Sequence, residues 1–379
     1  MTELVVVSLE AWDDVWRRNQ YLVSGLLARD PELRVLFVEP SDDPLHAVRG
    51  GSRPSFGHAP REVMERLWTF RPVKPLPRRV DRAADARIAR AVIRAAQRLG
   101  MSQPLLWIND PGAAAVAQLT DWPTLYDMTD DWVVADRPDA ERARLVGGEE
   151  WLLQHAASVV ACSPELVRRK SGQRDDIVLV RNAVDVERYR VPMERPADLP
   201  AGRTAVYVGT LHRDRLDVEL CVETARALGA EGTLVLVGPN ALGVEDTAAL
   251  QRNGVVVLGA KPRDAVPAYL QHADVLVVPH VVTDFTESLD PIKLYEYQAV
   301  GKPVVSTPVA GFRDAPNVVV GNASSSFSGE VADLLARLAA DSLEAMASTD
   351  ALASAGWTDR VDQLREVFEK LITPTSDRR

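Results

Sequence analysis

The densest group of residues that could do chemistry lies in residues 284–312, DFTESLDPIKLYEYQAVGKPVVSTPVAGF. Asp290 and Pro291 are typical of a helix start, because an aspartate can cap free backbone amides and a proline suits the first helical position. Gly301 is typical of the residue that follows a helix end. A helix that begins where a strand ends points its free amides and its positive dipole towards a ligand. The segment therefore predicts a site for phosphate groups.

Two charged side chains share one face of this predicted helix. Lys293 follows Ile292 in the first turn, where an ammonium can reach a diphosphate oxygen. Glu296 lies three residues later, and a bound diphosphate would repel its carboxylate unless that carboxylate had another task. Accepting hydrogen bonds from both hydroxyls of a ribose is such a task. The alternative is a surface ion pair between Lys293 and Glu296, worth about 0.3–0.5 kcal/mol.

A second group follows the first predicted strand, LVVVSL (4–9). It consists of one aromatic and three charged residues, Trp12, Asp13, Asp14 and Arg18. Aromatic and acidic side chains at a strand end suit stacking on a sugar ring and binding of its hydroxyls. The alternative is a packed surface loop in which Asp14 caps the next helix.

The elements that must position these groups follow a βα pattern. Short apolar runs, such as AVYVG (205–209), alternate with amphipathic stretches along most of the chain. We predict an α/β fold with two Rossmann-like, doubly wound domains, residues 1–190 and 200–357, joined by the proline-rich stretch 191–203. Residues 358–372 are expected to form a terminal helix. Two such domains would leave a cleft between the carboxyl ends of their strands, where ligands of such folds bind.

Composition and missing motifs narrow the class of ligand. A net charge of -10 argues against nucleic acid as the main partner. The sequence has no G-x-G-x-x-G after the first strand and no P-loop motif, which argues against dinucleotide dehydrogenases and P-loop enzymes. The six histidines lack zinc-type spacing, and Cys162 and Cys221 lie far apart. We expect neither a metal nor another cofactor.

The cytoplasm is the expected location. No apolar run approaches the roughly 18 residues of a membrane span, and the first residues lack the basic and apolar regions of a signal peptide. One stretch, 80–99, leaves an alternative open because four arginines share a face: Arg87, Arg90, Arg94 and Arg98. This face is either the solvated side of a packed crossover helix or a weak peripheral contact with the inner face of the cell membrane.

The segment 284–312 resembles the nucleotide-binding segment of bacterial GT-B glycosyltransferases of the teichuronic-acid-biosynthesis type, and more distantly that of the xanthan glucuronosyltransferase. Four other stretches are similar to that family's motifs in the same order: 178–189, 205–228, 234–240 and 255–280. In the first of these, Ala183 replaces the usual glycine. The resemblance implies the GT-B architecture, in which residues 358–379 cross back to the N-terminal domain.

The resemblance also implies a metal-independent transferase that moves a hexosyl group from a nucleoside-diphosphate sugar, with UDP as the expected nucleotide, to a hydroxyl acceptor. The pathway would be glycan, cell-envelope or secondary-metabolite biosynthesis. The resemblance assigns donor binding to five residues at the start of the predicted helix: Asp290, Pro291, Ile292, Lys293 and Glu296. It also assigns donor binding to strand ends and loops of the second domain: Gly209, Thr210, Arg213, Arg215, Gly238, Gly259 and Ala260. It assigns acceptor binding to the first domain, with Trp12, Asp13 and Arg18 as candidates.

The stereochemistry stays open. Retaining relatives carry an acidic pair spaced E-x7-E, whose second member matches Glu296, but the first position here is Ser288 with Glu287 beside it. This departure favours inversion, which needs a carboxylate base to take the acceptor proton. Asp130 and Asp131 are the best candidates for that catalytic base, because they follow the strand TLYDM, and Asp14 is the reserve. The alternative is that these aspartates cap the next helix.

Two other functions remain as alternatives. A nucleotide-sugar epimerase of the same architecture would work without an acceptor and would have no use for Trp12 and Arg18. A catalytically silent GT-B partner protein would bind the nucleotide and stabilise a second transferase. A simple observation separates the silent partner from a transferase, because a silent partner would not slowly hydrolyse a donor sugar on its own.

Overall fold

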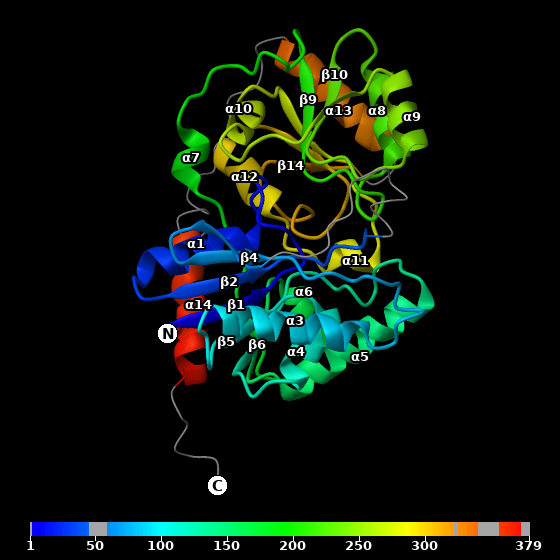
Figure 1. Ribbon diagram of the computed structural model, residues 1–379. Helices are drawn as coiled ribbons and strands as arrows, with labels where there is room; N and C mark the ends of the chain where they lie inside the picture. The colour runs from blue at the N-terminus through cyan, green and yellow to red at the C-terminus, as the bar shows by residue number, and fades with distance from the viewer. Residues whose placement is uncertain (1, 45–58, 322–323, 340–355, 373–379) are drawn as a thin grey trace. The chain divides into compact units, whose positions relative to one another are not determined.

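A computed structural model describes residues 2–44, 59–321, 324–339 and 356–372. The chain divides into two compact units (Figure 1). The N-terminal unit consists of Met1–Arg181 with Arg360–Arg379, and the C-terminal unit consists of Asn182–Asp359. The predicted linker, 191–203, thus lies within the C-terminal unit, and so do residues 182–190, which the sequence assigned to the first domain.

The N-terminal unit is built on an eight-stranded sheet in the order β3-β4-β2-β1-β5-β6-β7-β8. The strands are β1 (Glu3–Val7), β2 (Arg34–Val38), β3 (Arg61–Met64), β4 (Leu67–Phe70), β5 (Leu105–Ile108), β6 (Thr124–Met128), β7 (Ser158–Ala161) and β8 (Val178–Leu179). All neighbouring strands are parallel except β3 and β4. Successive residues of β1, such as Leu4 and Val5, are both fully buried, because both faces of the sheet are covered.

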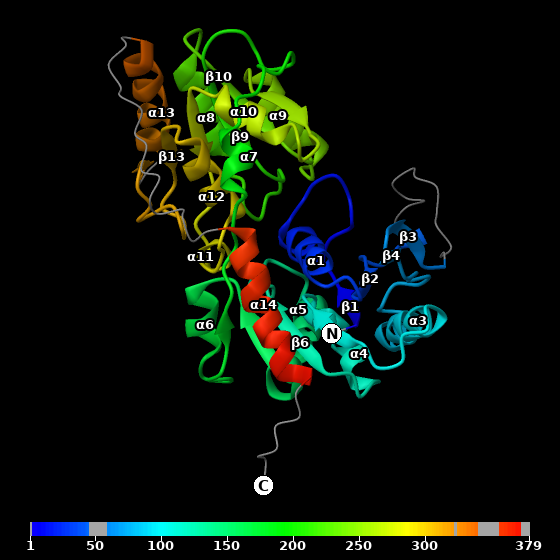
Figure 2. The same cartoon turned by 90° about the vertical axis from the view of Figure 1, so that its left-hand side faces the viewer.

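The helices that lie between these strands along the chain are α1 (Arg18–Arg29), α3 (Ala84–Arg98), η1 (Pro111–Ala113), α4 (Ala114–Gln118), α5 (Asp139–His155) and α6 (Pro164–Lys170). The greater part of α14 (Trp357–Ile372), which follows all the strands, also belongs to this unit. In both views α14 runs beside the sheet of this unit (Figures 1 and 2). The ring of Phe368 meets that of Trp107 edge to face at 6.1 Å between centroids.

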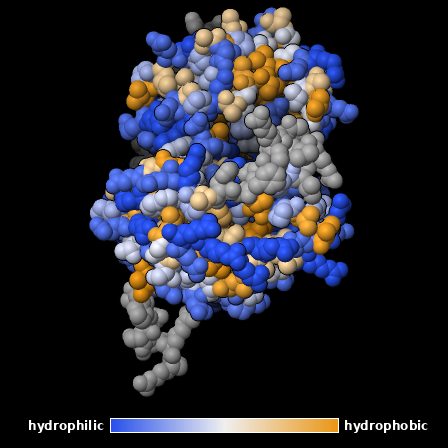
Figure 3. All heavy atoms as spheres, in the orientation of Figure 1, coloured by the Kyte–Doolittle hydropathy of each residue, from blue (hydrophilic) through white to orange (hydrophobic). Residues whose placement is uncertain are grey.

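Helix α3 contains the arginine face that the sequence left open. Its small apolar residues, among them Ala89 and Val92, are buried in the core of the N-terminal unit, while Arg90 and Arg94 are exposed. This is the packing of an ordinary crossover helix, and it gives the membrane alternative no support. Hydrophilic side chains predominate on the molecular face in Figure 3. In the described part of the chain, no helix combines the length and the apolar character that crossing a membrane requires.

The C-terminal unit contains a six-stranded parallel sheet in the order β11-β10-β9-β12-β13-β14. Its strands are β9 (Thr204–Val208), β10 (Thr233–Val237), β11 (Val256–Gly259), β12 (Val275–Val278), β13 (Val304–Ser306) and β14 (Val318–Val320). Its helices are α7 (Val186–Arg190), α8 (Val218–Leu228), α9 (Val244–Arg252), α10 (Val266–Gln271), α11 (Asp284–Glu287), α12 (Ile292–Val300) and α13 (Ser324–Ala339).

Two apolar clusters cover the two faces of this second sheet. Val206 packs with Leu294 of α12 in one cluster, and Tyr207, its neighbour in β9, belongs to the cluster that contains residues of α8 and α13. The alternation follows from the period of two in a strand. The prediction of two α/β domains with parallel sheets is confirmed. The antiparallel β3–β4 pair at the sheet edge was not predicted.

Candidate active site

The segment predicted to bind phosphate forms helix α12 between β12 and β13. Pro291 is its N-cap, and Gly301 ends it in the left-handed conformation, with φ 73°. Asp290 does not cap the helix, so that expectation was wrong. Its carboxylate instead accepts the backbone N–H of Asn182 at 2.6 Å and the hydroxyl hydrogen of Tyr295 at 2.8 Å. The first of these bonds ties the start of α12 to Asn182, the first residue of the C-terminal unit, and the second lies within the helix segment itself.

Lys293 lies in the first turn of α12, where the helix amides lack intrahelical partners. Its Nζ donates to the hydroxyl of Tyr207 at 2.8 Å and lies 3.2 Å from Nε2 of His280. The ammonium also lies 4.0 Å from the centroid of the Tyr207 ring, a cation–π distance. Burial, and after it the charge of Arg215, lowers the pKa of Lys293 well below its usual range.

Glu296 does not form an ion pair with Lys293. Its Oε1 accepts the hydroxyl hydrogen of Tyr189 in α7 at 2.5 Å. Burial raises the pKa of Glu296, although Tyr189 and Lys293 act in the opposite direction. The surface ion pair considered from the sequence is therefore absent between these two described residues, and both side chains have other partners.

The two candidate arginines have different surroundings. Arg213 is exposed and pairs with Glu219 at 2.9 Å and Asp246 at 2.7 Å. Arg215 is half-buried, lies 5.5 Å over the ring of Phe285, and is close enough to lower the pKa of Lys293. Arg215 and Lys293 are thus the two cations that lie together at this end of the sheet.

The glycines at the ends of the strands leave room beside these cations. Gly209 follows β9 with φ 153°, and a Cβ there would lie 2.8 Å from Nζ of Lys293. Gly238 follows β10 with φ 145°, and a Cβ there would collide with the carbonyl oxygen of Gly209. The N–H of Gly238 donates to the carbonyl of Gly259 at 2.9 Å. The carboxyl ends of β9, β10 and β11 are therefore joined closely at the backbone.

The remaining donor candidates lie in the same loops. Thr210 is half-buried and its carbonyl lies 3.5 Å from the Tyr207 hydroxyl, while Ala260 is exposed after β11. Ser288, at the first acidic position of retaining relatives, is fully buried and donates to the carbonyl of Phe285 at 2.7 Å. Its neighbour Glu287 is engaged by the guanidinium of Arg313 through both carboxylate oxygens. Neither residue 287 nor residue 288 therefore presents an unengaged carboxylate.

The sugar-binding candidates of the N-terminal unit lie in the loop between β1 and α1. Trp12 is half-buried, and its ring packs on that of Phe37 at 5.0 Å between centroids. Its backbone N–H donates to the Glu39 carboxylate at 2.9 Å. Asp13 is exposed and accepts the N–H of Val15 at 2.9 Å. Asp14 is exposed and does not cap α1, whose N-cap is Arg17.

Arg18 was predicted to bind a sugar, yet it is only 4% exposed. Its guanidinium donates to both oxygens of the buried Asp127 at 3.2 Å. The same carboxylate accepts hydrogen bonds from Trp107 and Asn109. A buried charge needs such partners, so the described contacts give Arg18 a structural task at the ends of β5 and β6.

The two adjacent base candidates have different surroundings. Asp131 is 1% exposed, and its carboxylate accepts from Lys170 at 2.9 Å and from Arg169 at 3.0 Å. Lys170 also donates to Glu149 at 2.6 Å, which places Asp131 inside a buried ionic network. Asp130 is half-buried. The structure brings Asp131 together with cations rather than with an open surface.

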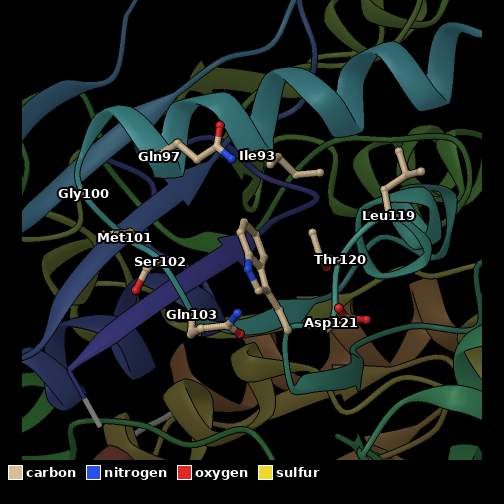
Figure 4. A pocket seen from close by; sticks show the side chains of 10 residues that line it. Ile93, Gln97, Gly100, Met101, Ser102, Gln103, Leu119, Thr120 and Asp121 are labelled. Atoms are coloured by element: carbon tan, nitrogen blue, oxygen red, sulfur yellow. The ribbon is translucent and has the colours of Figure 1, made fainter.

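A pocket of about 510 Å³ that the sequence did not indicate lies at the opposite, amino end of β5 and β6. Trp122 lies in its wall, and Figure 4 shows Ile93 and Gln97 of α3 on one side and Thr120 on the other. None of the candidate site residues lines it. Among the residues that the structure describes, no group of three or more histidine, cysteine, aspartate or glutamate side chains could hold a metal.

Comparison with known proteins finds a family match within the C-terminal unit. Residues 202–341 match the model of the family described as glycosyl transferases group 1. The teichuronic acid biosynthesis glycosyltransferase TuaH of Bacillus subtilis (strain 168) is 25% identical over 218 residues, which are 53% of this chain and 55% of that protein. The match thus spans about half of that relative. The D-inositol 3-phosphate glycosyltransferase of Nocardiopsis dassonvillei is 26% identical over 71% of this chain and 70% of its own.

Solved structures share the fold of the whole chain. Sucrose-phosphate synthase from Thermosynechococcus elongatus superposes with a TM-score of 0.71 at 19% identity, over 98% of this chain and 99% of its own. Anabaena HepE, solved in complex with UDP and glucose, has a TM-score of 0.68 at 15% identity, over 97% of this chain and 100% of its own. These structural neighbours are GT-B glycosyltransferases.

Proposed function

We propose that this chain, which carries a glycosyl transferases group 1 domain within the GT-B fold, transfers a hexosyl group from a nucleoside-diphosphate sugar to a hydroxyl acceptor. The observation that carries the proposal is the first turn of α12. There the charge of Lys293 has no carboxylate within ion-pair distance among the described residues, and Gly209 leaves space beside it. An ammonium that no described carboxylate pairs with, at a helix start and close to a guanidinium, suits a diphosphate.

The reaction breaks the bond between the anomeric carbon and a diphosphate oxygen, so negative charge develops on the leaving diphosphate. Lys293, Arg215 and the first amides of α12 would stabilise that charge, and such preorganised stabilisation is usually the largest catalytic contribution. Glu296 would accept hydrogen bonds from the ribose hydroxyls, while the Tyr189 hydroxyl donates to its Oε1. These protein charges supply what a metal would otherwise supply, so we propose that the reaction needs no divalent cation.

The relatives support this choice of donor. HepE has been solved with UDP and glucose, which makes UDP the first nucleotide to test here. The acceptor would bind to the N-terminal unit, with Trp12 and Asp13 as the candidate contacts. Arg18 is a weaker acceptor candidate, because Asp127 already occupies its guanidinium.

For the acceptor proton, we propose Asp130 as the base and Asp14 as the reserve. Asp131 suits that role less, because it is buried and its two carboxylate oxygens already accept hydrogen bonds from Arg169 and Lys170. The buried serine at position 288 agrees with inversion, since no acidic side chain stands there to assist a retaining reaction.

Thermal unfolding in the presence of nucleotides tests the proposal. A ligand that binds only the folded state at about 100 times its dissociation constant stabilises that state by about 2.7 kcal/mol. We expect UDP or another nucleoside diphosphate, and its sugar conjugates, to raise the unfolding temperature. Glu296→Gln should lose about 1.5–3 kcal/mol of nucleotide binding, the value of hydrogen bonds to a charged group.

Glu223→Gln, on the exposed face of α8, is the matched control and should bind as the wild type does. If no nucleotide or nucleotide sugar raises the unfolding temperature, the proposal is wrong. Binding without any donor cleavage would instead favour the silent partner, and conversion of the bound sugar without an acceptor would favour the epimerase.

A further inference from the structure

Lys293 is held in place by two uncharged side chains that come from different parts of the C-terminal unit. Tyr207 belongs to β9 and His280 follows β12, and both are buried. The three polar atoms form a triangle: Nζ lies 2.8 Å from the tyrosine hydroxyl and 3.2 Å from Nε2, and the hydroxyl lies 3.1 Å from Nε2. The two rings meet edge to face at 5.6 Å, which fixes their orientation.

The direction of these hydrogen bonds follows from the chemistry of the groups. An ammonium only donates, so the tyrosine oxygen and Nε2 of His280 must be available to accept. Burial, followed by the charges of Lys293 and Arg215, lowers the pKa of His280 well below its usual range. Burial also raises the pKa of Tyr207. Tyr207 and His280 are therefore both neutral near pH 7, and they orient Lys293 without neutralising its charge.

The carboxylates that could match this charge have other partners. Glu296, three residues after Lys293 on the same helix, is within the usual reach of an ion pair, but it is bonded to Tyr189. Asp290 is bonded to Asn182 and Tyr295. The lowered pKa of Lys293 expresses the cost of holding a charge that burial and Arg215 disfavour and that no carboxylate of the described residues contacts.

We propose that Tyr207 and His280 are positioning residues that keep the Lys293 ammonium away from Glu296 and leave its charge to be matched by a bound diphosphate. This inference rests on the proposed function, and it adds the origin of selectivity for a nucleoside diphosphate over a monophosphate. Without Tyr207 and His280, Lys293 would form an ion pair with Glu296. Neither the ammonium nor the carboxylate would then be available to bind the donor.

Calorimetric titration of the full chain with UDP, GDP and ADP, and with each corresponding monophosphate, tests the inference. The wild type should bind one diphosphate much more tightly than its monophosphate. Tyr207→Phe, which removes a single oxygen, and His280→Leu should each weaken diphosphate binding by about tenfold and leave monophosphate binding nearly unchanged. His280→Gln, which keeps an acceptor, should largely restore the wild-type ratio.

His280→Glu separates this role from a merely structural one. The new carboxylate would pair with Lys293, so the variant should stay folded yet lose the preference for the diphosphate. The inference is overturned if Tyr207→Phe and His280→Glu keep the wild-type ratio while Lys293→Met loses it. If the wild type binds no diphosphate, or if Lys293→Met binds it normally, the proposed function itself fails. Should His280→Leu not fold, the other two variants decide the outcome.

Discussion

Asp130 and Asp131 are adjacent in the sequence, but their environments differ in a way that decides what each can do. The carboxylate of Asp131 is buried with two cations, whereas Asp130 is half-buried. Removing one member of a buried ion pair leaves the other charge uncompensated, which costs about 3–5 kcal/mol. The two residues can therefore be distinguished by stability and activity together.

We expect Asp131→Asn to lower the free energy of unfolding by a few kcal/mol, because Lys170 and Arg169 would lose a charged partner. Asp130→Asn should cost less stability than Asp131→Asn, because Asp130 is only half-buried, and should reduce turnover by about 10²–10⁴-fold with donor affinity unaffected. Asp14→Asn is the parallel test of the reserve candidate. Urea unfolding, steady-state rates and the anomeric configuration of the product are the measurements.

Two results would contradict this assignment. One is near-normal turnover in both Asp130→Asn and Asp14→Asn. The other is a product that keeps the anomeric configuration of the donor, since retention does not use such a base. In that case the buried Ser288 would have to be reconciled with a retaining reaction.

Among single residues, the sequence was most informative where one helix carries the signal. The spacing of Lys293 and Glu296 placed both on one face of α12, and Gly301 marked its end. Tyr207 and His280 were missed because the contact between Lys293 and Tyr207 spans 86 residues, and a tyrosine in an apolar strand is typical of a core residue. The burial of Arg18 was also missed, since its partner Asp127 lies 109 residues away.

Among the elements, the link between a strand, its glycine and helix α12 determines where the ammonium of Lys293 lies. Gly209 has a backbone conformation that side chains rarely adopt, and an added Cβ would meet the ammonium. Gly301 also has positive φ, but nothing lies within 4 Å of an added Cβ there. A side chain would strain the backbone at both glycines, but only at Gly209 would it also contact Lys293.

We expect Gly209→Ala to weaken diphosphate binding at least tenfold, because the methyl group would displace the Lys293 ammonium. Gly301→Ala should cost about 1 kcal/mol of stability from the left-handed conformation and leave nucleotide affinity unchanged. Calorimetry and thermal unfolding of both variants provide the comparison. Equal effects on affinity would mean that backbone strain, not the contact with Lys293, is responsible.

Strands were easier to predict than the starts of helices. The valine- and leucine-rich runs of β9, β10 and β12 are continuous because both faces of the sheet are covered. The start of α12 differs from the prediction at Asp290. Its carboxylate accepts hydrogen bonds from Asn182 and Tyr295 and does not cap the helix amides. A sequence pattern cannot reveal such competition between distant donors.

At the scale of the whole molecule, the chain returns to its first unit at its end. Phe368 of α14 is 1% exposed and packs on Trp107, whereas Ile372 of the same helix is 48% exposed. Arg29 of α1 also pairs with Asp362 of α14 at 2.9 Å. The stability of the N-terminal unit thus depends on residues about 360 positions away from its first strand.

We expect Phe368→Ala to destabilise the N-terminal unit by about 3–5 kcal/mol, the usual cost of removing a buried aromatic ring. Ile372→Ala, on the exposed side of the helix, should cost less than about 0.5 kcal/mol. Urea unfolding followed by tryptophan fluorescence can report on Trp107. Indistinguishable stabilities for the two variants would show that α14 does not support the N-terminal core.

The central claim is that Lys293 stabilises the departing diphosphate of a nucleotide sugar without a metal ion. The most direct measurement is the release of nucleoside diphosphate from UDP-glucose and related donors, in excess EDTA, by the wild type and by Lys293→Ala. We expect slow release by the wild type alone, faster release with an acceptor, and a rate about 10²–10³-fold lower for the folded variant. Equal rates for the two proteins, or wild-type release that appears only when magnesium or manganese is restored, would contradict it.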